Sequence, residues 1–321
     1  MLISISISIS IIIAYILDRL IGDPKAIPHP VVLIGNCISK LEKIIRKSGY
    51  KNLKMAGLLF PLLIVGGSYL IVSLLSELSK LVHPLLFLFI QIILISTTIA
   101  TKGLADAALG IYHLLVRKDL EKARFALSMI VGRDTENLDE AEITRGTVET
   151  VAENIVDAII SPLFFALIGG APLAMAYRAT NTLDSMIGYK NEKYKDLGWA
   201  SARLDDILNF IPARITGLLL IVASWLLRLD AKKAFTIIIR DAKLHPSPNS
   251  GIPESAVAGA LQIQLGGTNY YKGIPSHRAV MGDSYRILQA DDILKTVKMM
   301  KASANIFVGM ILLGVVVGVL L

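Results

Sequence analysis

Charge, aromatic side chains and cysteine are all scarce in this sequence of 321 residues. Charged residues make up only 18% of the chain, whereas soluble globular proteins have roughly 25%. Hydrophobic residues make up 54%, and the mean hydropathy is +0.60. The shortage of charge and the long apolar runs therefore indicate an integral membrane protein rather than a soluble domain.

The single cysteine, Cys37, excludes an intrachain disulfide bond and a metal site built from several cysteines. We interpret it as a small apolar residue on a helix, because no feature near it suggests a catalytic thiol. Aromatic residues are 7% of the chain and no basic stripe alternates with them, which argues against nucleic-acid binding. The net charge of +7 instead fits basic loops on the cytoplasmic side of a membrane and would help attract an anionic substrate.

Familiar motifs of nucleotide sites and hydrolases are also missing. The absence of a GxxxxGK[ST] loop excludes a Walker-type ATP site, and there is no GxGxxG dinucleotide fingerprint. Neither an HExxH zinc helix nor a GxSxG nucleophile elbow occurs. Any catalysis must therefore depend on polar residues outside these motifs.

Six apolar segments are candidates to enter a membrane. The first alternates Ile with Ser, which is a strand pattern, but an isolated strand cannot satisfy its backbone groups in lipid, so we predict a helix. The fourth contains Pro162, Gly169-Gly170 and Pro172, and such breaks are tolerated where a helix lines a cavity. The segments are residues 1–17, 55–76, 82–101, 158–177, 214–229 and 304–321.

The basic loop 40–54 is expected in the cytoplasm by the positive-inside rule, which leaves the N-terminus outside. If both 158–177 and 214–229 cross the membrane, the polar loop 178–213 lies outside. If neither crosses, all polar regions share the cytoplasmic side. The basic residues of 178–213 favour the inside, so we prefer two re-entrant or cavity-lining segments, with 230–303 cytoplasmic.

The predicted fold class is all-α: a polytopic integral membrane protein of the cell membrane, with broken or re-entrant helices and cytoplasmic polar loops. Residues 103–131 are expected to form an amphipathic helix pair that turns near Arg117–Asp119. No internal repeat is evident, so we predict that residues 1–321 form a single membrane-embedded domain.

The longest polar run, residues 132–157, offers the first candidate site. Glu149, Glu153 and Asp157 recur at steps of four, so a helix would stack them on one face, where they repel each other unless a cation lies among them. Carboxylate oxygens suit Mg²⁺, which predicts a metal site. The alternative is a solvated helix face matched by Arg145 or by other loops. The candidate site residues in this run are Arg133, Asp134, Glu149, Glu153, Asn154 and Asp157.

A second candidate is residues 178–185, where Arg178, Asn181 and Asp184 could form a phosphate or metal corner. A helix N-cap at Thr182 or Asp184 is an equally good interpretation. Further oxygen ligands follow at Asp205, Asp206 and Asn209, although paired acids also suit a helix start.

Two stiff loops complete the candidates. Residues 245–254 hold three prolines, so His245, Asn249 and Glu254 should have fixed positions. In residues 18–36, which we predict to be a rigid non-helical connection, Asp23 and His29 suggest a site. Farther along, Gly266-Gly267 is expected to be a turn, and His277 and Arg278 could bind anions or simply lie on the surface.

Four long motifs together resemble one known family, the CbiB/CobD family of cobalamin biosynthesis, which are adenosylcobinamide-phosphate synthases. The motifs follow the same order along nearly the whole chain, from Asp18 to about Gly282. They are DRLIGDPKAIPHPVVLIG, GRDT…VETVAENIVDAIISPLFFALIGGAPLAMAYRATNTLDSMIGY, ARLDDILNFIPARITG and HPSPNSGIPESAVAGALQIQLGG. The one departure noted, Arg178 where a lysine is common, is conservative.

The resemblance implies an ATP- and Mg²⁺-dependent amide ligation. A carboxylate of adenosylcobyric acid, the adenosylated corrinoid substrate, would join the amine of aminopropanol phosphate or threonine phosphate through an acyl phosphate. Roles within the site then come from chemistry, because charge neutralisation on phosphate matters more here than a nucleophile. Arg133, Arg178 and His245 would meet phosphates, and Asn249 and Glu254 would orient the amine. Asp134 is a further catalytic candidate, and Asn154, Asn181, Asp184, Asp23 and His29 are candidates for binding the nucleotide.

Other functions remain open from the sequence alone. The chain could be a corrinoid-binding or corrinoid-transporting membrane protein, or a membrane subunit that acts with a soluble ATP-using partner. The acids lie in loops and at helix ends rather than inside apolar segments, which favours an enzyme. Expected partners are the small substrates, membrane lipid and other cobalamin-biosynthesis enzymes, with no nucleic acid.

Overall fold

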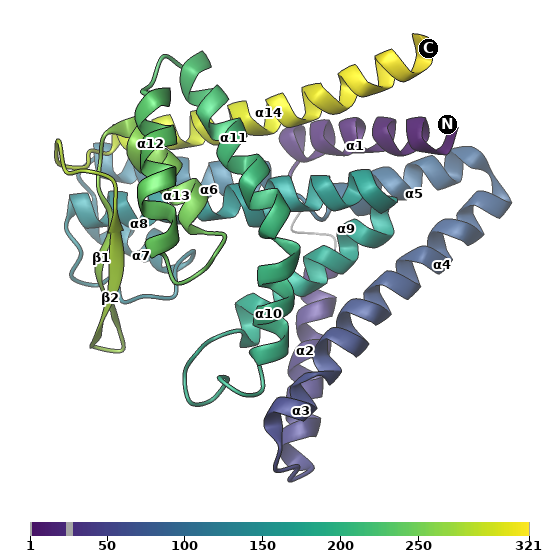
Figure 1. Ribbon diagram of the computed structural model, residues 1–321. Helices are drawn as coiled ribbons and strands as arrows, with labels where there is room; N and C mark the ends of the chain where they lie inside the picture. The colour runs from purple at the N-terminus through teal and green to yellow at the C-terminus, as the bar shows by residue number, and fades with distance from the viewer. Residues whose placement is uncertain (1, 24–27, 321) are drawn as a thin grey trace. The chain divides into compact units, whose positions relative to one another are not determined.

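A computed structural model describes residues 2–23 and 28–320, and this part of the chain is mostly helical (Figure 1). The elements, in chain order, are α1 (Leu2–Leu20), α2 (Pro30–Lys47), α3 (Leu53–Gly57), the π-helix Pro61–Val65, α4 (Gly66–Val82), α5 (Pro84–Ser96), α6 (Thr101–Val116), α7 (Leu120–Ser128), α8 (Glu140–Ile155), the π-helix Val156–Ile160, α9 (Ser161–Ile187), α10 (Trp199–Leu208), α11 (Phe210–Leu226), α12 (Ala231–Asp241), the 3-10 helix Ala242–Leu244, α13 (Gly251–Leu261), β1 (Leu265–Tyr271), β2 (Ile274–Met281) and α14 (Asp291–Leu320).

Four helical stretches in the described residues are long and apolar enough to cross a membrane: Leu53–Val82, Pro84–Val116, Glu140–Ile187 and Asp291–Gly318. The bent pair Trp199–Leu208 and Phe210–Leu226 makes a fifth if it is one span. The prediction of an all-α polytopic membrane protein is confirmed, with a small β-hairpin added. Residues 2–20 are helical as expected, although they are not among these candidates, so a spanning first helix stays a prediction.

The helix pair expected over 103–131 is confirmed as α6 and α7, which turn at Arg117–Asp119. Two expected loops are wrong in part. Helix α2 already begins at Pro30, because His29 caps it by accepting a hydrogen bond from the Val31 N–H, so residues 30–36 are not a loop. Residues 24–27 of the same expected loop lie outside the described residues.

The polar region 178–213 is also more helical than expected. Helix α9 continues to Ile187, and α10 follows, so only residues 188–198 connect them. The alternative of an N-cap at Thr182 or Asp184 is therefore wrong, because both residues lie inside α9. Because both residues belong to one helix, the directions of their side chains are set by the helical period, which a loop would not impose.

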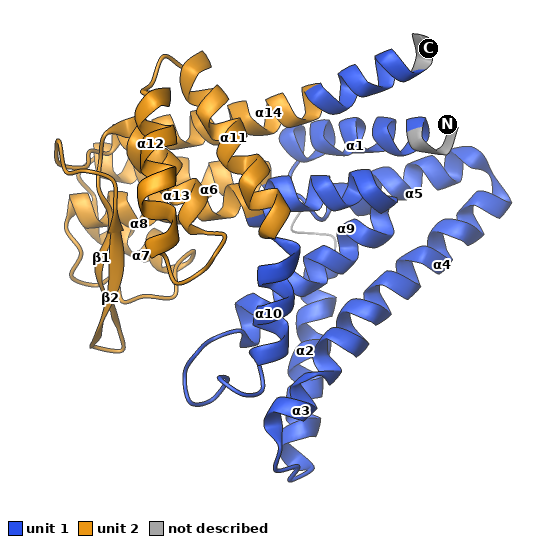
Figure 2. Ribbon diagram, in the orientation of Figure 1, with its two compact units in different colours: residues 1–100, 157–209, 310–321 blue, residues 101–156, 210–309 orange. Residues whose placement is uncertain are grey.

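Contacts between residues divide the chain into two compact units, coloured separately in Figure 2. Unit 1 comprises residues 1–100, 157–209 and 310–321, and unit 2 comprises residues 101–156 and 210–309. Each unit is thus assembled from segments far apart in sequence.

In unit 1, α9 packs against α2, α4, α5 and α10. The predicted break at Gly169-Gly170 is confirmed, and Gly170 has a φ of +65°. The buried side chain of Gln91 accepts the Ala171 N–H at 2.7 Å and donates to Ser76 at 2.9 Å. A neighbouring helix thus satisfies the backbone group that the break releases, as a membrane interior requires.

Unit 2 is centred on α13, all of whose residues are buried. Helix α13 contacts α8, α11 and α12. A Cβ at Gly259 would lie 2.5 Å from the backbone oxygen of Lys233, so the small residues of this helix permit the close approach of α12.

The β-hairpin of unit 2 was not predicted. Strands β1 and β2 are antiparallel, with an irregularity in register between Leu265 and Gly267. Gly266 and Gly267 have φ values of +87° and +94°, so they form this bulge and not the expected turn. The turn is Lys272-Gly273, where both residues have positive φ, as two-residue hairpin loops prefer.

Candidate functional site

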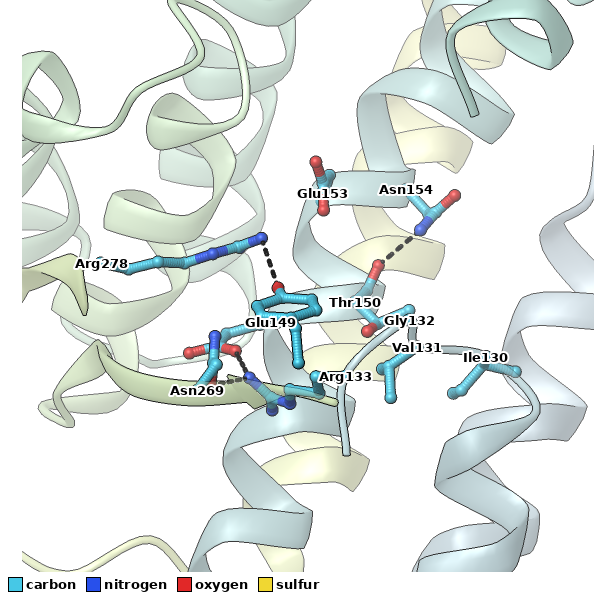
Figure 3. Close-up of a pocket in the computed structure, with 11 residues that line it drawn as sticks. Ile130, Val131, Gly132, Arg133, Glu149, Thr150, Glu153, Asn154, Asn269 and Arg278 are labelled. Atoms are coloured by element: carbon cyan, nitrogen blue, oxygen red, sulfur yellow. Dashed lines mark hydrogen bonds and ion pairs between the residues drawn. The ribbon is translucent and has the colours of Figure 1, made fainter. Parts of the chain in front are cut away.

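Unit 2 contains a polar pocket of about 160 Å³ between the loop before α8, one face of α8 and the hairpin (Figure 3). The lining residues are Ile130, Val131, Gly132, Arg133, Glu149, Thr150, Glu153, Asn154, Asn269, Tyr271 and Arg278. Four of the predicted site residues therefore meet here: Arg133, Glu149, Glu153 and Asn154. The pocket lies at the acidic run identified in the sequence.

The local sequence explains why α8 presents this face. Asp139 caps the helix by accepting a hydrogen bond from the Glu142 N–H, and the acids of the first turn suit the helix N-terminus. The helix continues to Ile155, so Glu149 and Glu153 are one turn apart on the same side. The face is thus fixed before any tertiary contact is made.

Glu149 is the centre of a buried ion-pair network. Its carboxylate accepts hydrogen bonds from Arg133 and Arg145, each at 2.8 Å, and from the Gly266 N–H at 2.8 Å. Asn269 joins through its oxygen, 2.5 Å from Arg133 Nη1 and 2.9 Å from Arg145 Nη2. The expected repulsion between stacked acids is thus relieved here by two arginines.

Arg133 retains unused hydrogen-bonding capacity. Its side chain is 6% exposed, yet Nε and Nη2, like Nδ2 of Asn269, have no partner among the described residues. Gly146 of α8 has no side chain, which leaves room for this arginine: a Cβ at Gly146 would lie 2.2 Å from Nη2. Buried donors without acceptors are uncommon, and an anionic ligand is a direct explanation.

The opposite wall carries a second arginine. Arg278, on β2, donates to the Tyr271 hydroxyl at 3.4 Å, and in Figure 3 it extends towards the side of α8 that bears Glu153. Burial alone would lower the pKa of Arg278, but Tyr271 and the nearby carboxylates raise it, so this residue stays a cation. Glu153 accepts a hydrogen bond from the Ser250 hydroxyl at 3.0 Å.

His245 and Glu254, on both of which Glu153 acts electrostatically, form a buried pair, 5% and 1% exposed. Nε2 of His245 lies 3.6 Å from Oε1 of Glu254, which is too far for a hydrogen bond. Nδ1 accepts the Ser247 N–H at 3.0 Å, so the proton of a neutral ring is on Nε2. Burial lowers the pKa of His245 and raises the pKa of Glu254 well above its usual value, so both favour their neutral forms.

Two predicted catalytic residues of unit 2 have structural contacts instead. Both carboxylate oxygens of Asp134 accept N–H groups of the hairpin turn, from Lys272 at 2.9 Å and Gly273 at 2.7 Å. Buried Asn249 accepts a hydrogen bond from Arg214 at 3.0 Å. Neither residue lines the pocket, so their catalytic roles stay predictions.

Unit 1 holds a second polar cluster, on α9 and α10. Arg178 donates to Asn181 at 3.4 Å, and Asp184 acts electrostatically on Asp205. Asn209 donates to Asp205 at 2.9 Å. Within residues 2–23 and 28–320, neither Nε of Arg178 nor Oδ1 of Asp205 has a hydrogen-bond partner, although both atoms are buried.

The remaining predicted residues lie around Arg178 in the same unit. Asp23 and Asp157 are the acids that act on its guanidinium, and Nε2 of His29 is 3.3 Å from Asp23. Asp157 is in a π-helical turn, where its backbone oxygen accepts the Tyr177 hydroxyl at 3.2 Å. The step of four from Glu153 therefore does not continue as a regular α-helix.

No group of three His, Cys, Asp or Glu side chains in the described residues is arranged to hold a metal ion. The Mg²⁺ role of Glu149, Glu153 and Asp157 thus stays a prediction, and Glu149 is already committed to arginines. Mg²⁺ commonly binds through one or two carboxylates together with substrate phosphates, so a preformed cage is not required.

Asn269 and Tyr271 were not predicted from the sequence. Arg278 was named there only as a residue that binds anions or lies on the surface. The signal that was available is Lys272-Gly273 between two short β-prone runs, which predicts a hairpin. In unit 1, Asp205 and Asn209 were named from the sequence as further oxygen ligands but were not included among the predicted site residues.

Comparison with known proteins gives consistent results. The model of the CobD/Cbib protein family matches residues 11–300. "Cobalamin biosynthesis protein CobD" of Clostridium perfringens is 50% identical over 288 residues, covering 90% of this chain and 91% of that protein. "Cobalamin biosynthesis protein CbiB" of Salmonella typhimurium is 44% identical over 302 residues, covering 94% and 95%. No solved structure matches the chain significantly.

Proposed function

Since the chain belongs to the CobD/CbiB family and thus has a role in cobalamin biosynthesis, we propose that it is an adenosylcobinamide-phosphate synthase. The reaction joins a carboxylate of adenosylcobyric acid to the amine of aminopropanol phosphate, or of threonine phosphate, and consumes ATP. The polar motifs that carry the reaction are proposed to lie on the cytoplasmic side of the cell membrane.

One observation carries this proposal: a small pocket in which a buried arginine keeps two donor atoms unpaired among the described residues. Aminopropanol phosphate presents phosphate oxygens, which are the acceptors that Arg133 and Asn269 lack. Charge-assisted bonds of this kind are stronger than neutral ones, and a buried guanidinium suits phosphate particularly well.

Mg²⁺ has its best donor set in unit 1. Asp184, Asp205 and Asn181 supply carboxylate and amide oxygens, and Oδ1 of Asp205 has no partner within the described ranges. Hard cations take such oxygen ligands together with phosphate oxygens. When bound, Mg²⁺ would neutralise charge on transferred phosphate, and Arg178 would serve the same purpose from the neighbouring turn.

The proposed chemistry has two steps. A carboxylate oxygen of the corrinoid takes the γ-phosphoryl group of ATP, which releases ADP and gives an acyl phosphate. The amine nitrogen then attacks the carbonyl carbon, the C–N bond forms, the C–O bond to phosphate breaks, and the nitrogen loses a proton. The chain contributes phosphate binding by arginines and, at Glu153, a carboxylate able to accept that proton.

The proposal is tested with protein purified in lipid nanodiscs and given adenosylcobyric acid, aminopropanol phosphate, ATP and Mg²⁺. Mass spectrometry should detect the amide product together with ADP, in amounts that depend on all four additions. Corrinoid binding without any product, under conditions where the protein is folded, would instead favour the alternative of a corrinoid-binding or corrinoid-transporting protein.

A further inference from the structure

The pocket of unit 2 presents both signs of charge within a small volume. Arg133 and Arg278 lie on its walls as cations, and Glu149 and Glu153 as anions. Glu149 is consumed by the buried arginines, each at 2.8 Å. Glu153 has no arginine or lysine within ion-pair distance among the described residues, so it remains the free negative group of the pocket.

The positive end of the pocket has hydrogen-bond donors and positive charge that suit a phosphate. Among the described residues, Arg133 and Asn269 hold buried donors with no acceptor, and the Arg278 guanidinium has one hydrogen bond, to the Tyr271 hydroxyl at 3.4 Å. These groups come from the loop before α8 and from both strands. Three residues that line one pocket from separate elements can surround a tetrahedral anion, which one exposed lysine cannot.

The negative end is Glu153, which lies toward His245 and Glu254. Among the described residues its side chain has one hydrogen bond, from the Ser250 hydroxyl at 3.0 Å, and the residue is half-buried and lines the pocket. An ammonium group has three donors and needs acceptors of this kind. Inorganic phosphate or a nucleotide would gain nothing from Glu153, because two anions repel.

Size narrows the ligand further. Sites that bury drug-sized ligands have volumes of about 300–1,000 Å³, whereas this pocket has about 160 Å³. Neither a corrinoid nor a whole nucleotide can be enclosed in such a volume. A short chain with one phosphate and one amine can.

We propose that this pocket is the site of the amino-alkyl phosphate, with the phosphate held by Arg133, Asn269 and Arg278 and the ammonium held by Glu153. The identity of the ligand depends on the proposed function, whereas the charge pattern is a property of the pocket itself. The site thus selects a zwitterion and rejects phosphates that lack an amine.

The test is calorimetric binding to the full-length protein in nanodiscs, without ATP or corrinoid. The probes are aminopropanol phosphate, propyl phosphate, 1-amino-2-propanol and inorganic phosphate. We expect aminopropanol phosphate to bind about tenfold to a hundredfold more tightly than propyl phosphate, which is the range for a hydrogen bond to a charged group.

Two variants locate the two ends. Glu153→Gln should reduce the affinity for aminopropanol phosphate to the level of propyl phosphate, and the affinity for propyl phosphate should not change. Arg278→Gln should weaken both phosphates equally. The matched controls are Glu121→Gln and Arg117→Gln, which alter exposed residues of unit 2 away from the pocket and should bind like the parent.

Equal binding of the two alkyl phosphates by the parent protein overturns the proposal, as does normal discrimination in Glu153→Gln. Binding of inorganic phosphate as tight as that of aminopropanol phosphate marks an adventitious ion only, and also overturns it. If the zwitterion binds as predicted but no ATP-dependent amide forms, the ligase function fails and the pocket assignment stands. If the protein forms the amide but both variants bind the probes like the parent, the ligase function stands and the pocket assignment fails.

Discussion

Nη1 of Arg133 lies 2.8 Å from Oε2 of Glu149, and both side chains are almost completely buried. This ion pair connects the loop before α8 to the helix itself, and it leaves Nε and Nη2 of the guanidinium without a hydrogen-bond partner among the described residues. The acidic face seen in the sequence is therefore divided into a structural carboxylate, Glu149, and an accessible one, Glu153.

Glu149→Gln should destabilise the protein rather than change its use of metal. Removing one partner of a buried ion pair costs about 3–5 kcal/mol, because the other charges stay buried and unpaired. Thermal unfolding in nanodiscs should show the loss, while residual activity should keep the parental Mg²⁺ dependence. A folded, stable variant with an altered Mg²⁺ requirement would show that Glu149 is a metal ligand after all.

Arg133→Lys should impair phosphate binding while keeping a positive charge beside Glu149. A lysine cannot reproduce the fork of donors, so we expect the KM for aminopropanol phosphate to rise about tenfold to a hundredfold. Steady-state kinetics with saturating ATP measures this. The exposed-site control Arg117→Lys should be unaffected, and an unchanged KM in Arg133→Lys would exclude the arginine from the site.

Asp205→Asn should weaken the binding of Mg²⁺. The substitution removes one negative ligand but keeps shape and hydrogen bonding to Asn209, so the Mg²⁺ concentration for half-maximal activity should rise at least about tenfold. Titration of activity with Mg²⁺ at fixed ATP measures the shift. Asp206→Asn is the control on the adjacent position, and equal effects of both variants would point to general electrostatics instead of ligation.

The pair His245 and Glu254 predicts how stability depends on pH. The folded-state pKa of Glu254 is raised, so stability is complete below its unfolded pKa of about 4.3 and is lost as pH rises through the folded pKa. The folded-state pKa of His245 is lowered, so its contribution is lost as pH falls below about 6.5. Above about pH 6.5 the contribution of His245 is complete, so any further loss of stability from this pair comes from Glu254.

Glu254→Gln should therefore flatten the pH profile on the alkaline side. The amide mimics the neutral acid and does not ionise, so the melting temperature should decline less from pH 7 to pH 9 than in the parent. Thermal unfolding at several pH values checks this, with Glu121→Gln expected to keep the parental slope. Parallel profiles for parent and Glu254→Gln would mean that Glu254 is ionised in the fold at neutral pH.

Gln91→Leu tests the break in α9. The substitution keeps the size but leaves the buried Ala171 N–H without its acceptor, which costs about 1–3 kcal/mol. The melting temperature should fall accordingly, and Gln91→Glu should recover part of it because a carboxyl group can still accept. No loss of stability in Gln91→Leu would show that the released N–H finds another partner.

Much of the fold was available from the sequence because it depends on local patterns. The broken segment at Gly169-Gly170 follows from the backbone freedom of glycine next to proline. The turn at Arg117–Asp119 follows from a charged interruption between two amphipathic runs. The acidic face of α8 likewise follows from spacing alone.

The site was predicted only in part, because its other half is distant in sequence. Asn269 contacts Arg133 and Arg145 across more than a hundred residues, and Gly266 donates to Glu149 over a similar separation. No periodicity reveals such pairings. The hairpin could have been recognised from Lys272-Gly273, but its position against α8 is a tertiary property that the sequence pattern does not contain.

The central claim is that the chain itself makes an amide through a phosphorylated carboxylate. The most direct measurement uses adenosylcobyric acid labelled with ¹⁸O in the reacting carboxylate, with ATP, Mg²⁺ and aminopropanol phosphate. The account predicts one ADP per amide and one labelled oxygen in the released inorganic phosphate. Amide formation with unlabelled phosphate, with the label in AMP, or without any consumption of ATP would contradict it.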